Sequence, residues 1–367
     1  MIRLPHPGPL PVLIAALTLA RVAIAPAADA TPPRSARALI DHQHWKQARA
    51  LLEAEQKERP RDPTVLTGLC QVRLAFHDLD AAQKLGEQAI AIAPNDAEAH
   101  EALSEVFGER ASNASMFKVM GLAGRFRKEA ETALHLDPKQ IDARLGLMEF
   151  HVRAPGIAGG DKKKALRYAQ EVGEIDASKG ELALARYCQE TGDTNAVEAH
   201  YRSAIEKDPN DVEARVALAS WCTAPWRQKW DEAEKNARAA SEAEPDRAIP
   251  YLLLASIYAH QQRWSDLDAV LSAADAACPD DRNPWYQSGR ILLLDGTDLP
   301  RAEKSFRRFL EIEPEPNGPT LAHGRWRLAL VLEKEGKRSE AVAELEEALK
   351  LKPDLDPAKK DLKRMKG

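Results

Sequence analysis

This sequence of 367 residues has few aromatic residues, no large excess of positive or negative charge, and no recognisable catalytic motif. Phe, Trp and Tyr make up only 5% of it, and alanine is abundant, which suits closely packed helices better than sheets. Acidic residues number 57 and basic residues 52, so the net charge is −5. A chain so balanced lacks the basic footprint of a nucleic-acid-binding protein, and we expect no nucleic-acid partner.

Cysteine is also rare, and none of the four cysteines forms a CxxC pair. This excludes a zinc ribbon and a thioredoxin-like redox site. Cys188 and Cys222 are placed to lie on neighbouring helices, so a disulfide between them and buried free thiols both stay open. HExxH, GxSxG and phosphate-loop motifs are absent, and the sequence predicts no enzyme, no metal and no cofactor.

The N-terminus has the pattern of an export signal. Arg3 precedes an apolar run from Leu10 to Ala20, and small residues follow. The pattern predicts a signal peptide over residues 1–30, cleaved near Ala27 or Ala30. The apolar run falls short of the ~20 residues that span a bilayer. We therefore expect an exported, periplasmic protein without a stable membrane span.

A helical segment that ends in proline recurs along the chain, with a base spacing of 34 residues, as between Pro60 and Pro94. Small residues stand twelve and five positions before most of these prolines, for example Ala82 and Ala89 before Pro94. Small residues allow helices to approach closely, and proline ends the second helix of each unit. The closing residues are Pro60, Pro94, Pro138, Asp176, Pro209, Pro245, Pro279, Pro314 and Pro353.

This pattern resembles the tetratricopeptide repeat (TPR), in which bulky, leucine, small and aromatic residues mark the first helix and two alanines the second. The match is clearest at Tyr251, Leu254, Ala255, Tyr258, Leu267, Ala274 and Pro279. The resemblance implies an all-α, right-handed α-α superhelix, a TPR solenoid of about eight or nine helix-turn-helix units. The chain is also similar to exported bacterial TPR proteins of unassigned role.

The repeat sets the expected domain organisation. We expect a repeat array over residues 33–354 and a polar capping helix over residues 355–367. A single helix pair cannot bury its apolar face, so each unit stacks on its neighbours. An elongated curved rod without a single central core is the expected shape.

Glutamates at positions 98, 101, 105 and 109 are spaced three or four apart after Pro94, which places them on one helix face. In TPR proteins the first helix of each unit lines a concave groove. Glu98, Glu101, Glu105 and Glu109 therefore either receive a basic peptide or form a solvated face paired with nearby lysines and arginines.

Two interruptions of the repeat carry further candidates. Trp226 lies outside the repeat rule beside Arg227, a pair typical of interaction hot spots, although packing across the turn explains it equally well. The glycine-rich segment from Gly156 to Asp161 opens a helix that begins with Lys162. It is either a tight turn or an anion-binding site.

These features favour a protein-binding scaffold or assembly factor of the bacterial envelope, which acts through the concave face on other proteins or peptides. One alternative is a structural subunit of an envelope secretion or polysaccharide-export complex. Another is small-ligand or anion binding at the glycine-rich segment. The sequence does not define the oligomeric state.

Overall fold

The computed structural model describes residues 35–316 and 318–367, and within them every regular element is a helix. The predicted signal peptide lies outside the described residues. The first helices are α1 (Ala36–Asp41), α2 (Trp45–Glu58), α3 (Pro63–Ala75), α4 (Leu79–Ile92), α5 (Ala97–Ser112), α6 (Met116–Leu136), α7 (Ile141–Arg153), α8 (Lys162–Ile175) and α9 (Ala177–Thr191). The others are α10 (Thr194–Lys207), α11 (Val212–Cys222), α12 (Trp230–Ala243), α13 (Ala248–His260), α14 (Trp264–Ala277), α15 (Asn283–Asp295), α16 (Leu299–Phe309), α17 (Leu321–Lys334), α18 (Arg338–Leu351) and α19 (Asp356–Lys366).

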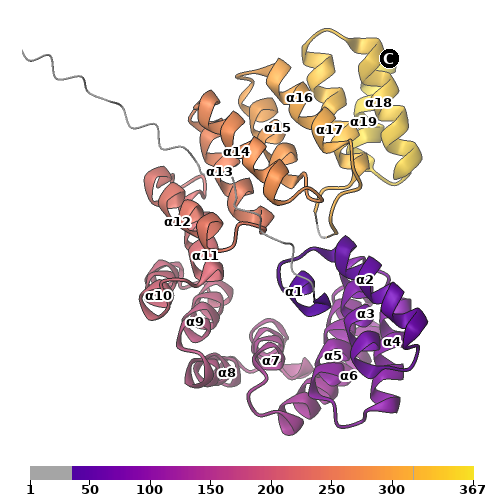
Figure 1. Ribbon diagram of the computed structural model, residues 1–367, viewed down its shortest axis with the longest axis vertical. Coiled ribbons are helices and arrows are strands. Elements are labelled where there is room, and N and C mark those ends of the chain that lie inside the picture. Colours follow the sequence, from indigo (N-terminus) through magenta and orange to yellow (C-terminus); the bar gives the residue numbers. More distant parts are fainter. Residues whose placement is uncertain (1–34, 317) are drawn as a thin grey trace, which may run out of the picture.

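Successive helices pack as hairpins, from α1 with α2 to α17 with α18, and α19 covers the last hairpin. From α3 to α17, each odd-numbered helix also contacts the next odd-numbered helix. Figure 1 shows these odd-numbered helices on the inner side of a curved stack and their even-numbered partners outside. The predicted all-α superhelix of about eight or nine units is therefore confirmed, and it has a concave face built by the odd-numbered helices.

Local sequence signals define where the helices begin and turn. Aspartate side chains accept backbone N–H groups at the start of seven helices, as the carboxylates of N-caps do. Within most hairpins, one residue of the turn has a positive φ, which reverses the chain direction sharply. The capping residues are Asp62, Asp78, Asp96, Asp161, Asp176, Asp211 and Asp298.

The apolar core follows the stack instead of forming one centre. The largest cluster of buried residues runs from α9 to α19, and smaller clusters fill the interfaces between the earlier helices. Small residues permit the closest approaches. A Cβ added to Gly180 of α9 would lie 2.2 Å from the Cα of Gly173 in α8. Each unit is thus held by its neighbours, as expected for a repeat array.

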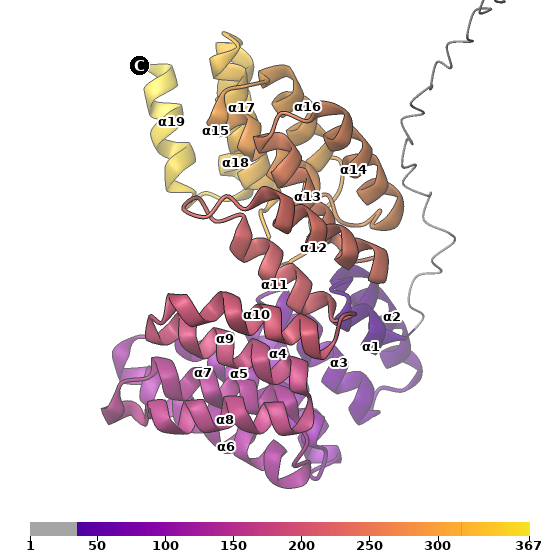
Figure 2. The same cartoon turned by 90° about the vertical axis from the view of Figure 1, so that its left-hand side faces the viewer.

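The shape differs from the elongated curved rod that the sequence predicts. In Figure 1 the stack curves until α1 and α2 meet the C-terminal units, and Figure 2 shows α7–α10 below and α14–α19 above. This curvature brings the first hairpin back to the turns before α13, α15 and α17. Polar contacts then join them. We call this junction the clasp; it consists of Asp41, His42, His44, Lys46 and Gln47 with Asp246, Arg247, Asp280, Glu313 and Glu315.

Candidate protein-binding face

The acidic face begins with the local structure of α5. Asp96 caps this helix by accepting the backbone N–H groups of Glu98 and Ala99. A helix turns once every 3.6 residues, so glutamates three or four apart share one face. The opposite face carries Leu103 and Phe107, which are buried against α6 and α7. Burial of that apolar face turns the four predicted glutamates toward the concave side.

Glu101 and Glu105 form the centre of this face. The side chain of Glu101 is buried, with the residue only 4% exposed, whereas Glu105 retains contact with solvent. Burial raises the pKa of Glu101 well above its usual value, and Glu105 and Asp142 raise it further. Although the residue is exposed, desolvation of the Glu105 carboxyl group and then Asp142 raise its pKa to about 7, and a hydrogen bond with Glu101 acts against this rise. The carboxyl groups therefore repel one another wherever they are ionised.

Asp142 also belongs to this acidic cluster, although it is not one of the four glutamates on α5. It lies in the first turn of α7 and acts on both glutamates. The repeat contains the signal for it, because Asp142 follows Pro138 by the same four positions that separate Glu98 from Pro94. Equivalent positions of neighbouring units lie side by side on a concave face.

Cations border this cluster without entering its centre. Glu98 pairs with Arg37 of α1 at 2.5 Å, and farther along the face Arg186 of α9 pairs with Glu149. Glu109 accepts a hydrogen bond from Asn113 at 2.9 Å. In the residues that the structure describes, no cationic side chain forms an ion pair with Glu101 or Glu105 within 4 Å. The cation that acts on this centre from a distance is Arg37, which opposes the rise in the pKa of Glu105 but is already paired with Glu98.

The two residues of the second predicted contact, Trp226 and Arg227, lie in different environments. Trp226 is 77% exposed in the turn between α11 and α12. Arg227 instead turns inward, where its guanidinium lies 4.3 Å from the ring centre of Trp221 and 2.6 Å from Glu198. Figure 1 places this turn far from α5, with α7–α10 between them. The two predicted contact regions are thus separate.

The glycine-rich segment forms a tight turn. Gly159 has a φ of 94°, and a Cβ on Gly160 would lie 1.7 Å from the carbonyl oxygen of Ala154. The carboxylate of Asp161 accepts the N–H groups of Lys163 and Lys164 at the start of α8. The chain's own carboxylate thus takes the place that an external anion would occupy, and the neighbouring lysines point to solvent.

The four cysteines are all free and buried, so no disulfide joins Cys188 to Cys222. Burial raises the pKa of the Cys70 thiol to about 12 and that of Cys222 to about 11. Thiols with such pKa values are protonated at neutral pH and pack as small apolar groups. Among the described residues, no group of three or more candidate ligands is arranged to hold a metal ion.

A family model described as "Tetratricopeptide repeat" matches residues 322–355, the hairpin of α17 and α18. The same hairpin geometry repeats along the rest of the array. The chain is a tetratricopeptide repeat protein. Within this TPR stack, the acidic cluster lies on the face formed by the first helices of two successive units, α5 and α7.

Relatives and solved structures with similarity to this TPR protein are distant. Superkiller complex protein 3 of Mus musculus is 28% identical over 294 residues, covering 77% of this chain and 17% of the relative. Its Homo sapiens counterpart is 29% identical over 212 residues, covering 55% of this chain and 13% of that protein. Yeast Tom70 is 16% identical, with a TM-score of 0.47 over 90% of this chain and 86% of its own.

These relatives correct one prediction. Both curated relatives come from mammals, and the chain spans less than a fifth of their length. These mammalian relatives contradict the prediction of an exported, periplasmic protein, which is therefore wrong. That prediction depended only on the composition of an N-terminal segment, which lies outside the described residues. In residues 35–316 and 318–367, no helix combines the length and apolar character needed to cross a bilayer.

Proposed function

We propose that this TPR protein is a protein-binding scaffold that holds a lysine- or arginine-rich segment of a partner against the acidic centre of its concave face. The observation that carries the proposal is the crowding of Glu101, Glu105 and Asp142, none of which forms an ion pair among the described residues. An incoming cation would relieve their repulsion, and the exposed part of Glu105 gives it access. The bordering pairs, Glu98 with Arg37 and Glu149 with Arg186, limit the site to about two units.

Binding of a basic peptide tests this proposal. We expect a histidine-free peptide rich in lysine and arginine to bind in isothermal titration calorimetry, more weakly at high salt because counter-ions screen the attraction. The double variant Glu101→Gln with Glu105→Gln should reduce the affinity at least tenfold. Glu206→Gln is the matched control, because Glu206 is exposed on the outer helix α10. Equal loss in both variants, or binding of an acidic peptide of the same length, would refute the proposal.

Trp226 is a second proposed contact, made at a distance from the acidic face. Exposed tryptophan offers a large apolar surface at low entropic cost, which is why it is frequent among interface hot spots. Arg227 is left out of this contact because Trp221 and Glu198 engage it. Trp226→Ala should weaken capture of a folded partner without changing the affinity for the short basic peptide.

A second candidate function is a permanent structural subunit of a multiprotein complex. The name of the mammalian relatives, Superkiller complex protein 3, favours it. A permanent subunit would co-purify in fixed stoichiometry through gel filtration at high salt. A partner recruited through the acidic face would dissociate under the same conditions.

A further inference from the structure

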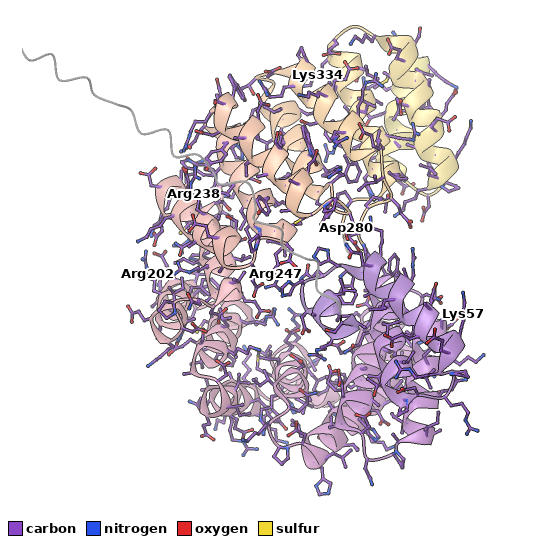
Figure 3. All side chains as sticks on the ribbon, in the orientation of Figure 1. Lys57, Arg202, Arg238, Arg247, Asp280 and Lys334 are labelled. Carbon is purple, nitrogen blue, oxygen red and sulfur yellow. The ribbon has the colours of Figure 1, made fainter. Side chains whose placement is uncertain are left out.

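The clasp joins parts of the chain that are more than 200 residues apart. His42 Nδ1 lies 2.9 Å from Asp246, and His44 Nδ1 lies 3.2 Å from Asp280. Lys46 Nζ donates to the backbone carbonyl oxygen of Asp280 at 2.6 Å. Figure 3 labels Asp280 and Arg247 where the C-terminal units face the first hairpin.

Glu315 completes the clasp by capping a helix from a distance. The first turn of α2 has no side-chain cap of its own, and the backbone N–H of Lys46 donates to Glu315 Oε2 at 3.2 Å. Glu315 comes from the segment between α16 and α17 and is only 5% exposed. A C-terminal side chain thus occupies the N-cap site of an N-terminal helix.

The clasp is polar, unlike the interfaces between neighbouring units. The buried apolar cluster of α1–α3 and that of α9–α19 have no residue in common among the described residues. The charged groups of the clasp are mostly buried, so the cost of removing them from water offsets much of their attraction, and each pair contributes little net stability. Closure is therefore weak compared with the apolar stacking of the units, and the stack can open here without unfolding.

The charges in the clasp make its closure depend on protons. Burial raises the pKa of Glu315 to about 8, with Asp280 and Asp281 of the neighbouring turn adding to the rise and Lys46 opposing it. Although burial alone would lower it, the pKa of His44 is raised by Asp280, Asp246 and Glu315.

Asp280 shifts in the opposite direction. Burial acts to raise its pKa, but the hydrogen bonds from His44 and Gln47 hold it at about 2. The other charged groups in reach are Arg49, which lies 3.9 Å from Glu313, and Arg247, which donates to the backbone oxygen of Asp41. Neither faces Glu315 directly in the contacts that the structure describes.

We propose that the clasp is a proton-operated latch: the TPR stack is closed at mildly acidic and neutral pH, and it opens at alkaline pH when Glu315 loses its proton. The direction follows from linkage. In the open state Glu315 has an ordinary carboxyl pKa and is ionised above about pH 5. In the closed state it still holds its proton at that pH. His44 acts in the same direction, and Asp280 matters only below about pH 4. If opening releases one proton, the ratio of closed to open molecules falls by up to tenfold for each pH unit between about pH 5 and 8.

Energy transfer between two dyes measures the opening. Ala50→Cys on α2 and Ala269→Cys on α14 place thiols at exposed positions on the two sides of the clasp. The four native thiols are buried and stay unlabelled. We expect transfer efficiency to fall between pH 6 and pH 9, while the helical circular dichroism signal stays unchanged.

Three variants in the labelled protein separate the latch from a general effect of pH. Glu315→Gln mimics the protonated side chain and should keep the stack closed at pH 9. Glu311→Gln, in the same segment, is the matched control and should open like the parent, because the exposed carboxylate of Glu311 pairs with Arg308 on its own side of the clasp. Lys46→Met removes the central cation and should lower the transfer at every pH.

The outcomes decide the proposal. Constant energy transfer from pH 6 to pH 9 in the parent protein would overturn it, as would the same pH transition in Glu315→Gln and the parent. Loss of the transition in Glu315→Gln alone supports it. None of these measurements uses the basic peptide, so the latch and the acidic face stand or fall separately.

Discussion

The protonation of Glu105 makes the affinity for a basic peptide depend on pH. With a pKa of about 7, this carboxyl group is mostly protonated at pH 6 and mostly ionised at pH 8. A bound cation favours the ionised form, so binding releases a proton and strengthens as the pH rises. The fraction ionised changes about tenfold between these pH values, and solvent contact reduces the expected gain in affinity to about three- to tenfold.

Calorimetry in two buffers checks both parts of this prediction. The dissociation constant for a histidine-free basic peptide should fall from pH 6 to pH 8, and the heat at pH 7 should depend on the ionisation enthalpy of the buffer. Glu105→Gln should abolish the buffer dependence and flatten the pH profile. An affinity that is constant or weaker at pH 8, or a pH profile unchanged in Glu105→Gln, would refute the assigned role of Glu105.

The remaining predictions concern stability, measured by urea unfolding. Gln262 has a φ of 56° in the turn between α13 and α14, so Gln262→Gly should stabilise the protein by about 0.5–1 kcal/mol, while Gln261→Gly next to it should destabilise it. Gly180→Ala should cost more than about 2 kcal/mol, because its Cβ meets backbone, whereas Gly121→Ala in open space on α6 should gain about 1 kcal/mol. Asp161→Ala should lower the stability through loss of the α8 cap; no loss would contradict the capping role.

The sequence predicts the repeated part of this molecule well because each unit depends on local rules. Prolines such as Pro94 end the second helix of a unit, and alanines such as Ala82 and Ala89 are fully buried where the spacing requires small residues. The helix face of Glu98 to Glu109 follows from the 3.6-residue period alone. Contacts within one unit or between neighbours are therefore accessible from the pattern.

Contacts that depend on the summed curvature of many units cannot be predicted from the sequence pattern. No spacing rule joins His44 to Asp280 or Lys46 to Glu315, because small rotations at every interface decide whether these residues meet. The direction of the Arg227 side chain was equally hidden, since Trp221 and Glu198 reach it from different helices. The neighbours of Glu101 were partly readable, because Asp142 occupies the register of Glu98 in the next unit.

Open repeat arrays melt from their free termini, where the outermost hairpin has a neighbour on one side only. Here the cap that Glu315 provides to α2 gives the first hairpin a second neighbour, drawn from the far end of the chain. Loss of the segment between α16 and α17 would therefore loosen the opposite terminus first. Amide exchange in α1 and α2 thus reports on Glu315, which lies 269 positions from the N–H group that it caps.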